Sequence, residues 1–219
     1  MPSTPQAGGG TQLSPEQAMS LLREGNARFV AGRCEGPNRG RSRLKETAEG
    51  GQRPFGAVLA CCDSRVTVEL LFDRGIGDLF VVRVAGNVCA ADEAASLDYA
   101  VARFGVPLIV VLGHTDCKLV TGVALGERLP LSLLGLSGIV GVAVRAARRA
   151  HPGLDGPALV PEAIRANVWQ SIEDLSVRAP LVREAARSKR LQVVGALYDV
   201  EEGIVHWLGA HPDGLRLFG

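Results

Sequence analysis

Two cysteines and one histidine are the residues of this chain whose types and spacing best suit chemistry. Cys61 lies in Ala-Cys-Cys-Asp-Ser-Arg, and His114 and Cys117 lie together in Gly-His-Thr-Asp-Cys. Thiolates and imidazoles are common zinc ligands. A structural zinc site usually has four protein ligands, whereas a catalytic site keeps one position open for water. Each residue alone also fits an ordinary buried or surface role. The set of three predicts one catalytic zinc ion per chain.

The elements that must position these residues are short apolar runs alternating with helix-like segments. Strands are predicted at residues 57–61, 79–84, 108–112 and 191–197. Helices are predicted at residues 66–73, 92–104, 117–126, 130–149 and 161–188. This alternation predicts an α/β fold with a mostly parallel central sheet and helices on both faces. Residues 198–208 are typical of a hairpin that adds an antiparallel edge strand.

The predicted strand ends bring the three candidate ligands together. Cys61 closes the first apolar run and His114 follows the third. In open α/β sheets, ligands gather at the carboxyl ends of the strands. We expect Cys117 in the first turn of the next helix, where the helix N-terminus lowers the pKa of a thiol.

The N-terminal region is predicted to contain a tail and a helical arm. Residues 1–12 are rich in Gly, Pro, Ser and Thr and lack a signal-peptide pattern, so we expect a disordered tail and a cytoplasmic protein. Residues 13–219 have the length of a single domain. A capping box at Ser14 begins a helix that extends to about Ala31. Its narrow apolar stripe has no evident partner within the chain. Residues 33–54 read as a loop with one short helical piece at 44–48.

Composition argues against several classes of partner. Lys and Arg number 24 against 23 Asp and Glu, so no long-range field attracts nucleic acid or a membrane surface. Apolar runs such as residues 107–113 are shorter than the ~20 residues of a membrane span, so none is expected. Five cysteines without a secretion signal favour metal-binding or free thiols over disulfides.

Ordered motifs along nearly the whole chain resemble the β-class carbonic anhydrases of plants and bacteria. The motifs are Glu24-Gly25-Asn26-x-Arg28-Phe29, Gly51-Gln52-x-Pro54, Cys61-x-Asp63-Ser64-Arg65, Phe80-Val81-Val82-Arg83-x-Ala85-Gly86-Asn87, Tyr99-Ala100-Val101, Gly113-His114-x-x-Cys117 and Gly195-Ala196-x-Tyr198-Asp199. The resemblance implies reversible hydration of carbon dioxide to bicarbonate by a zinc enzyme.

The resemblance also implies roles for individual residues. Cys61, His114 and Cys117 would hold Zn²⁺, with water or hydroxide in the fourth position. Asp63 and Arg65 would form a dyad that orients the zinc-bound hydroxide, because an arginine fork can hold a carboxylate through two hydrogen bonds. In some members the counterpart of this aspartate takes the open zinc position at lower pH. Zinc-bound water has a pKa of ~7 in favourable sites. Two thiolate ligands should give the bound water a higher pKa, so we expect hydration activity to have a mildly alkaline pH optimum.

Three further residues match the substrate pocket of plant-type members. Gln52 would donate a hydrogen bond to the substrate, and Phe80 and Tyr99 would form an apolar wall, although core packing suits both aromatics nearly as well. The unpartnered first helix and the resemblance together indicate a homodimer, or a dimer of dimers, in which Gln52 reaches across the interface.

Three departures from the family pattern leave alternatives open. Lys118 stands where Gly is common, Val58 where some members that bind a non-catalytic bicarbonate have Trp, and Cys62 where Ser or Ala is usual. One alternative function is hydrolysis of carbonyl sulfide or carbon disulfide on the same scaffold. Another is a zinc- or redox-responsive protein whose catalysis Cys62 or Lys118 has disabled.

Overall fold

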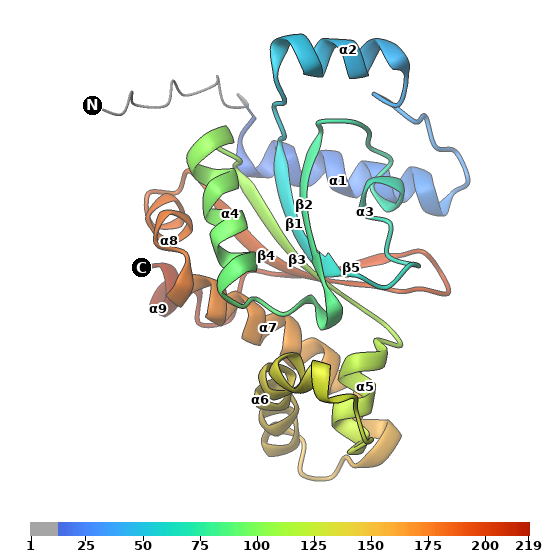
Figure 1. Ribbon diagram of the computed structural model, residues 1–219, viewed down its shortest axis with the longest axis vertical. Helices are drawn as coiled ribbons and strands as arrows, with labels where there is room; N and C mark the ends of the chain where they lie inside the picture. The colour runs from blue at the N-terminus through green and yellow to red at the C-terminus, as the bar shows by residue number, and fades with distance from the viewer. Residues whose placement is uncertain (1–12) are drawn as a thin grey trace.

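A five-stranded sheet forms the centre of the molecule in a computed structural model that describes residues 13–219, so the predicted tail lies outside the described residues. The strands lie in the order β2-β1-β3-β4-β5 (Figure 1). They are β1 (Gly56–Cys61), β2 (Leu79–Val84), β3 (Leu108–His114), β4 (Gln192–Tyr198) and β5 (Val205–Gly209). The first four pair in parallel and β5 pairs antiparallel to β4. The predicted fold class is confirmed.

Helices connect and cover the strands. They are α1 (Pro15–Val30), α2 (Arg41–Gly50), α3 (Val68–Leu71), α4 (Ala91–Phe104), α5 (Lys118–Leu125), α6 (Leu134–Ala150), α7 (Val160–Arg178), α8 (Pro180–Arg187) and α9 (Gly214–Phe218). The single helix predicted at 161–188 is wrong, because it is divided into α7 and α8 at Ala179. Proline disfavours a helical conformation in the residue before it, and Pro180 therefore explains the break.

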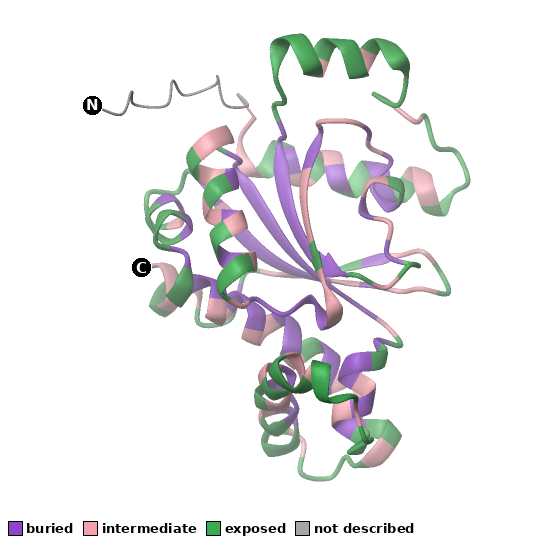
Figure 2. Ribbon diagram, viewed as in Figure 1, coloured by how far each residue is buried: buried purple, intermediate pink, exposed green. Residues whose placement is uncertain are grey.

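Alternating side chains divide the core into two layers. Val58 and Val110 face one side, where α1 and α3 pack. Leu59 and Val111 face the other side, where α4, α7 and α8 pack. Because both faces are covered, the strands read as continuous apolar runs, and Figure 2 shows the central strands buried along their length.

Helix α1 packs on its own chain, so the expectation that it lacks an internal partner is wrong. Its Ala18 and Leu22 are fully buried in the core. A Cβ atom at Gly25 would lie 1.8 Å from the carbonyl oxygen of Phe72, so only glycine permits this close approach. Asn26 donates to the carbonyl oxygens of Leu71 and Gly203 at 3.1 and 2.9 Å, which ties the helix to the domain.

Helix α2 is the element that stands away from the body. Figure 1 shows it beyond the start of β1, and none of its residues is buried (Figure 2). It extends the short helical piece predicted at 44–48 in both directions. Arg43 anchors it by donating to the carbonyl oxygen of Ile76 at 2.9 Å. The element that projects from the domain is therefore α2, whereas the arm was predicted to be the N-terminal helix α1.

The segment Leu131–Ala150 has the length and composition of a membrane span, with a mean hydropathy of 1.4. The prediction that no span is expected counted only continuous apolar runs, and glycine, serine and arginine interrupt the apolar residues of this segment. Val140 and Val144 on its helical part, α6, pack in a core cluster with residues of α5 and α7. One such helix is weak evidence for a membrane protein, since core helices meet the same criterion.

Candidate metal centre

Cys61 and His114 end two neighbouring parallel strands. Ala60 of β1 lies opposite Leu112 of β3, so both strands finish at the same edge of the sheet. Cys117 follows three residues after His114 and directly precedes α5, rather than lying in its first turn. The two sulfur atoms and an imidazole nitrogen lie within 4.8 Å of one another, and all three residues are buried. The structure therefore brings the predicted ligands together.

The imidazole of His114 is oriented as a metal ligand requires. Its Nδ1 lies 2.8 Å from the carbonyl oxygen of Thr115, and because a carbonyl only accepts, Nδ1 must carry the hydrogen. Nε2 is then a free acceptor, and it is buried without a hydrogen-bond partner. Buried polar atoms are rarely left unpaired. A metal ion on Nε2 would satisfy it, so these residues fit the implied zinc.

The proximity of the two thiols shifts their pKa values in opposite directions. A hydrogen bond from the Cys117 thiol, opposed by burial, lowers the pKa of Cys61 to about 3. The same contact, together with burial, raises the pKa of Cys117. The predicted lowering at Cys117 is therefore wrong for this pair, although the backbone amides of Val120 and Leu119 do act in that direction. Zinc binds thiolates, so its binding would release the Cys117 proton.

A turn after β2 donates a backbone hydrogen bond to the sulfur of Cys61. Gly86 has a φ of 73°, a conformation that favours glycine, and its N–H donates to Cys61 Sγ at 3.3 Å. Helix α7 fixes this turn, because Asn167 donates to the Gly86 carbonyl oxygen and Ser171 to that of Asn87. The sequence reasoning missed Asn167 and Ser171. The available signal was two polar residues four positions apart on an otherwise apolar helix face.

Asp63 and Arg65 form a two-point ion pair beside the ligands. Arg65 Nε and Nη2 donate to the two carboxylate oxygens of Asp63 at 3.0 and 2.7 Å. These bonds hold the pKa of Asp63 well below its usual range, so the side chain stays ionised and can only accept hydrogen bonds. Arg83 donates to the carbonyl oxygens of Cys61 and Asp63, which fixes the backbone between them. The sequence reasoning assigned Arg83 no such contact.

The two unusual residues near the ligands both lie at the surface. Cys62 is exposed while Cys61 is buried, in line with the alternation expected along a strand. Lys118 places its ammonium 2.7 Å from Asp116 Oδ1, and 76% of its side chain is exposed. Asp116 in turn accepts from Arg65 Nη1 at 3.0 Å.

The structure places the predicted substrate residues near the amino ends of the strands, whereas the candidate ligands lie at the carboxyl ends. These substrate residues are Gln52, Phe80 and Tyr99. Phe80 pairs with Ala57, four residues before Cys61, which corresponds to ~13 Å along a strand. Tyr99 contacts Phe80 with ring centroids 6.3 Å apart. Within one chain the structure does not bring these residues to the candidate ligands.

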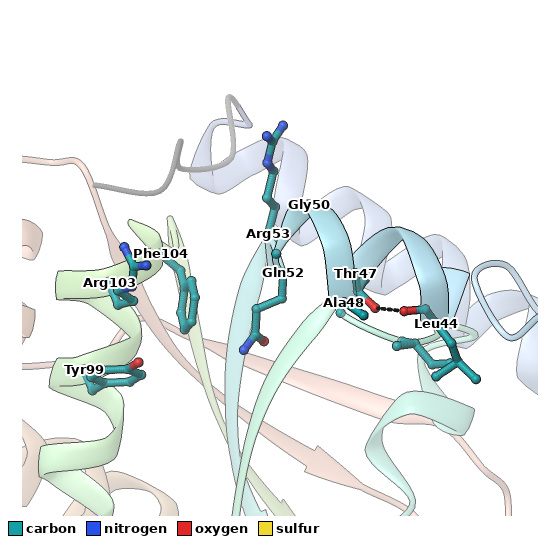
Figure 3. Close-up of a pocket in the computed structure, with 12 residues that line it drawn as sticks. Leu44, Thr47, Ala48, Gly50, Gln52, Arg53, Tyr99, Arg103 and Phe104 are labelled. Carbon is teal, nitrogen blue, oxygen red and sulfur yellow. Dashed lines mark hydrogen bonds between the residues drawn. The ribbon is translucent and has the colours of Figure 1, made fainter. Parts of the chain in front are cut away.

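An open cavity of about 630 Å³ is lined by two of these predicted substrate residues, Gln52 and Tyr99. Figure 3 shows the Gln52 side chain between the aromatic rings of α4 and the helix α2. Gln52 is exposed, and 54% of Tyr99 is exposed. The remaining lining includes Thr47, Phe104 and Arg103.

Comparisons with known proteins identify relatives along most of the chain. A family described as "Carbonic anhydrase" matches residues 56–205. The "Carbonic anhydrase 2" of Mycobacterium tuberculosis is 35% identical over 196 residues, covering 87% of this chain and 91% of that protein.

Solved structures share the fold. A β-carbonic anhydrase of Aspergillus fumigatus has a TM-score of 0.69 and 25% identity over 93% of this chain and 94% of its own. A structure described as a tetrameric β-carbonic anhydrase of Sordaria macrospora has a TM-score of 0.67 and 22% identity, and covers 88% of this chain and 97% of its own.

Proposed function

This chain belongs to the family of β-class carbonic anhydrases, and on that premise we propose that it hydrates carbon dioxide reversibly with a zinc ion held by Cys61, His114 and Cys117. The observation that carries the proposal is the convergence of two buried thiols with the unpartnered Nε2 of His114. Thiolate and imidazole together suit zinc. When bound, zinc would activate water as a nucleophile near neutral pH.

Asp63 has the properties of the residue that orients this nucleophile. Arg65 donates its Nε and its backbone N–H to Asp63 Oδ1 and its Nη2 to Oδ2, and a carboxylate has about four lone-pair sites, so acceptor capacity remains at Oδ2. Because Asp63 stays ionised, it can only accept a hydrogen bond. The nucleophile must therefore point its O–H at the carboxylate. That orientation leaves a lone pair of the nucleophile available to the carbon of carbon dioxide.

A second copy of the chain would complete the substrate pocket. Gln52 and Tyr99 are exposed in an open cavity far from the ligands of their own chain, so they are available to the site of a neighbour. In a homodimer, or a dimer of dimers, Gln52 would supply a donor to the substrate and Phe80 and Tyr99 an apolar wall. The tetrameric relative from Sordaria macrospora is compatible with this assembly.

We also infer a cytoplasmic location. All five cysteines are free thiols in the structure, and zinc binding requires two of them reduced. Reducing conditions are those of the cytoplasm.

Stopped-flow hydration of carbon dioxide by Asp63→Ala tests the proposed mechanism. We expect at least a hundredfold loss of kcat/KM with one zinc still bound per chain, within the range that a lost transition-state contact produces. Wild-type turnover of carbonyl sulfide or carbon disulfide but not carbon dioxide would favour the alternative hydrolase. Activity unchanged in the variant would contradict the role of Asp63.

The same assay tests whether Cys62 or Lys118 has disabled the site. Cys62→Ser and Lys118→Gly restore residue types common in the family. An inactive wild type that gains hydration through either change would support the non-enzymatic alternative. We expect both variants to stay within a few-fold of an active wild type.

A further inference from the structure

Asp116 connects Arg65 to Lys118 at the edge of the metal centre. Arg65 Nη1 donates to its Oδ2 at 3.0 Å, and Lys118 Nζ donates to its Oδ1 at 2.7 Å. Arg65 Nη2 also lies 3.3 Å from the backbone carbonyl oxygen of Asp116. The neighbouring edge of the same guanidinium, formed by Nε and Nη2, holds Asp63. Charges therefore alternate along a chain of four side chains from Lys118 to Asp63.

The backbone at Asp116 is unusual and matches this connection. Its φ is 56°, in the left-handed region that few residues other than glycine, asparagine and aspartate adopt. This residue lies between two candidate ligands, His114 and Cys117. The turn thus lets the flanking residues supply ligand atoms while the side chain of Asp116 reaches Arg65 from another loop.

The contacts fix the direction of the Arg65 guanidinium. A side chain that is 39% exposed would otherwise sample several rotamers, and with Asp63 as its only partner the two-point pair could still move as a unit. A second carboxylate on the other edge removes this freedom. Lys118 in turn holds Asp116, because it occupies the oxygen that Arg65 does not use.

We propose that Asp116, fixed by Lys118, is a positioning residue that holds Arg65 in the orientation in which it pairs with Asp63. The inference rests on the proposed role of Asp63 in the hydration reaction. It gives Lys118 a function at the position where the family commonly has glycine. An exposed ion pair is usually weak, so the effect should be several-fold and not absolute.

The test compares Asp116→Asn, Lys118→Ala and the double variant with wild type. Asparagine tolerates the left-handed conformation, so D116N removes the charge without straining the turn. Asp213→Asn is the matched control, because Asp213 pairs with Arg216 at the same 3.0 Å in an exposed pair outside the site. Zinc content and melting temperature show that each variant is folded and loaded.

Two readouts decide the proposal. Crystal structures of zinc-loaded and zinc-free D116N should show Arg65 displaced or in several conformers, with its two-point contact to Asp63 lost in part. The kcat/KM for carbon dioxide should fall about three- to fivefold in D116N, less in K118A, and no further in the double variant, because the residues act in series. D213N should leave both readouts unchanged.

An unchanged conformation of Arg65 in D116N would overturn the proposal whatever the activity. If the wild type is active, an unchanged kcat/KM in D116N would also overturn it. A wild type that binds zinc but does not hydrate carbon dioxide would instead contradict the proposed function. In that case the crystallographic comparison alone decides whether Asp116 positions Arg65.

Discussion

The side-chain amide of Asn167 donates to the carbonyl oxygen of Gly86 at 2.7 Å. Gly86 in turn donates its own N–H to the sulfur of Cys61 at 3.3 Å. Asn167 is buried on α7, and the turn at Gly86 follows β2, so a helix late in the sequence fixes the surroundings of a candidate ligand on β1. The candidate centre therefore depends on residues that do not touch the metal position.

Replacing Asn167 by Ala should weaken zinc binding. The change leaves the Gly86 carbonyl oxygen buried without its donor, which costs about 1–3 kcal/mol of unfolding free energy. Loss of outer contacts of this kind typically weakens metal affinity about 10- to 100-fold. Competition with a zinc chelator measures the affinity, and Gln170→Ala on the same helix is the control. Equal affinities in the two variants would contradict the supporting role.

Asp73 should make the protein sensitive to acid. It is fully buried, which raises its pKa, but a hydrogen bond from Arg28 and the amides of Glu35 and Gly36 outweigh burial and hold the pKa at about 2. A lowered folded-state pKa contributes stability above the unfolded value near 4 and loses it as the pH falls through about 2. Asp73→Asn should therefore cost on the order of 2 kcal/mol at pH 7.

Urea unfolding at a series of pH values measures this dependence. The difference in stability between wild type and D73N should be constant from pH 7 to about 5 and shrink between about pH 4 and pH 2. Asp155→Asn, at an exposed position, is the control. A difference that stays the same down to pH 2 would show that the carboxylate charge of Asp73 does not stabilise the fold.

Mixing two impaired variants tests whether Gln52 acts on a partner's site. His114→Ala should lack zinc, and Gln52→Ala should keep zinc but lose about 10-fold or more in kcat/KM, as lost hydrogen-bonding contacts to a reacting substrate do. In a mixed dimer one site would have both its metal and the partner's Gln52. Co-expression should therefore restore up to half of wild-type activity per mixed dimer. No restoration in purified mixed dimers would indicate that Gln52 does not act across subunits.

The sheet and the convergence of the three candidate ligands could be predicted because each depends on local sequence. Strands buried on both faces produce continuous apolar runs, and Cys61 and His114 come at the ends of two such runs. Parallel pairing then places both at one edge. Periodicity, the rule that ligands gather at the carboxyl ends of parallel strands, and ligand chemistry were sufficient for that part of the site.

The missed features depend on contacts between distant segments. The packing of α1 on its own chain relies on Gly25 against Phe72, and a glycine in a helix gives no sign of what approaches it. The contact of Asn167 with Gly86 spans 81 positions. The opposite pKa shifts of Cys61 and Cys117 follow from their proximity, which no local rule for helix ends includes.

The most direct test of the account is stopped-flow hydration of carbon dioxide by protein of measured zinc content. Wild-type chain should be stripped of metal with a chelator and reloaded in steps, with His114→Ala treated in parallel. The account predicts that the wild-type rate rises in proportion to bound zinc up to one ion per chain and that H114A stays at the uncatalysed rate. A fully zinc-loaded wild type without hydration, or hydration independent of zinc content, would contradict it.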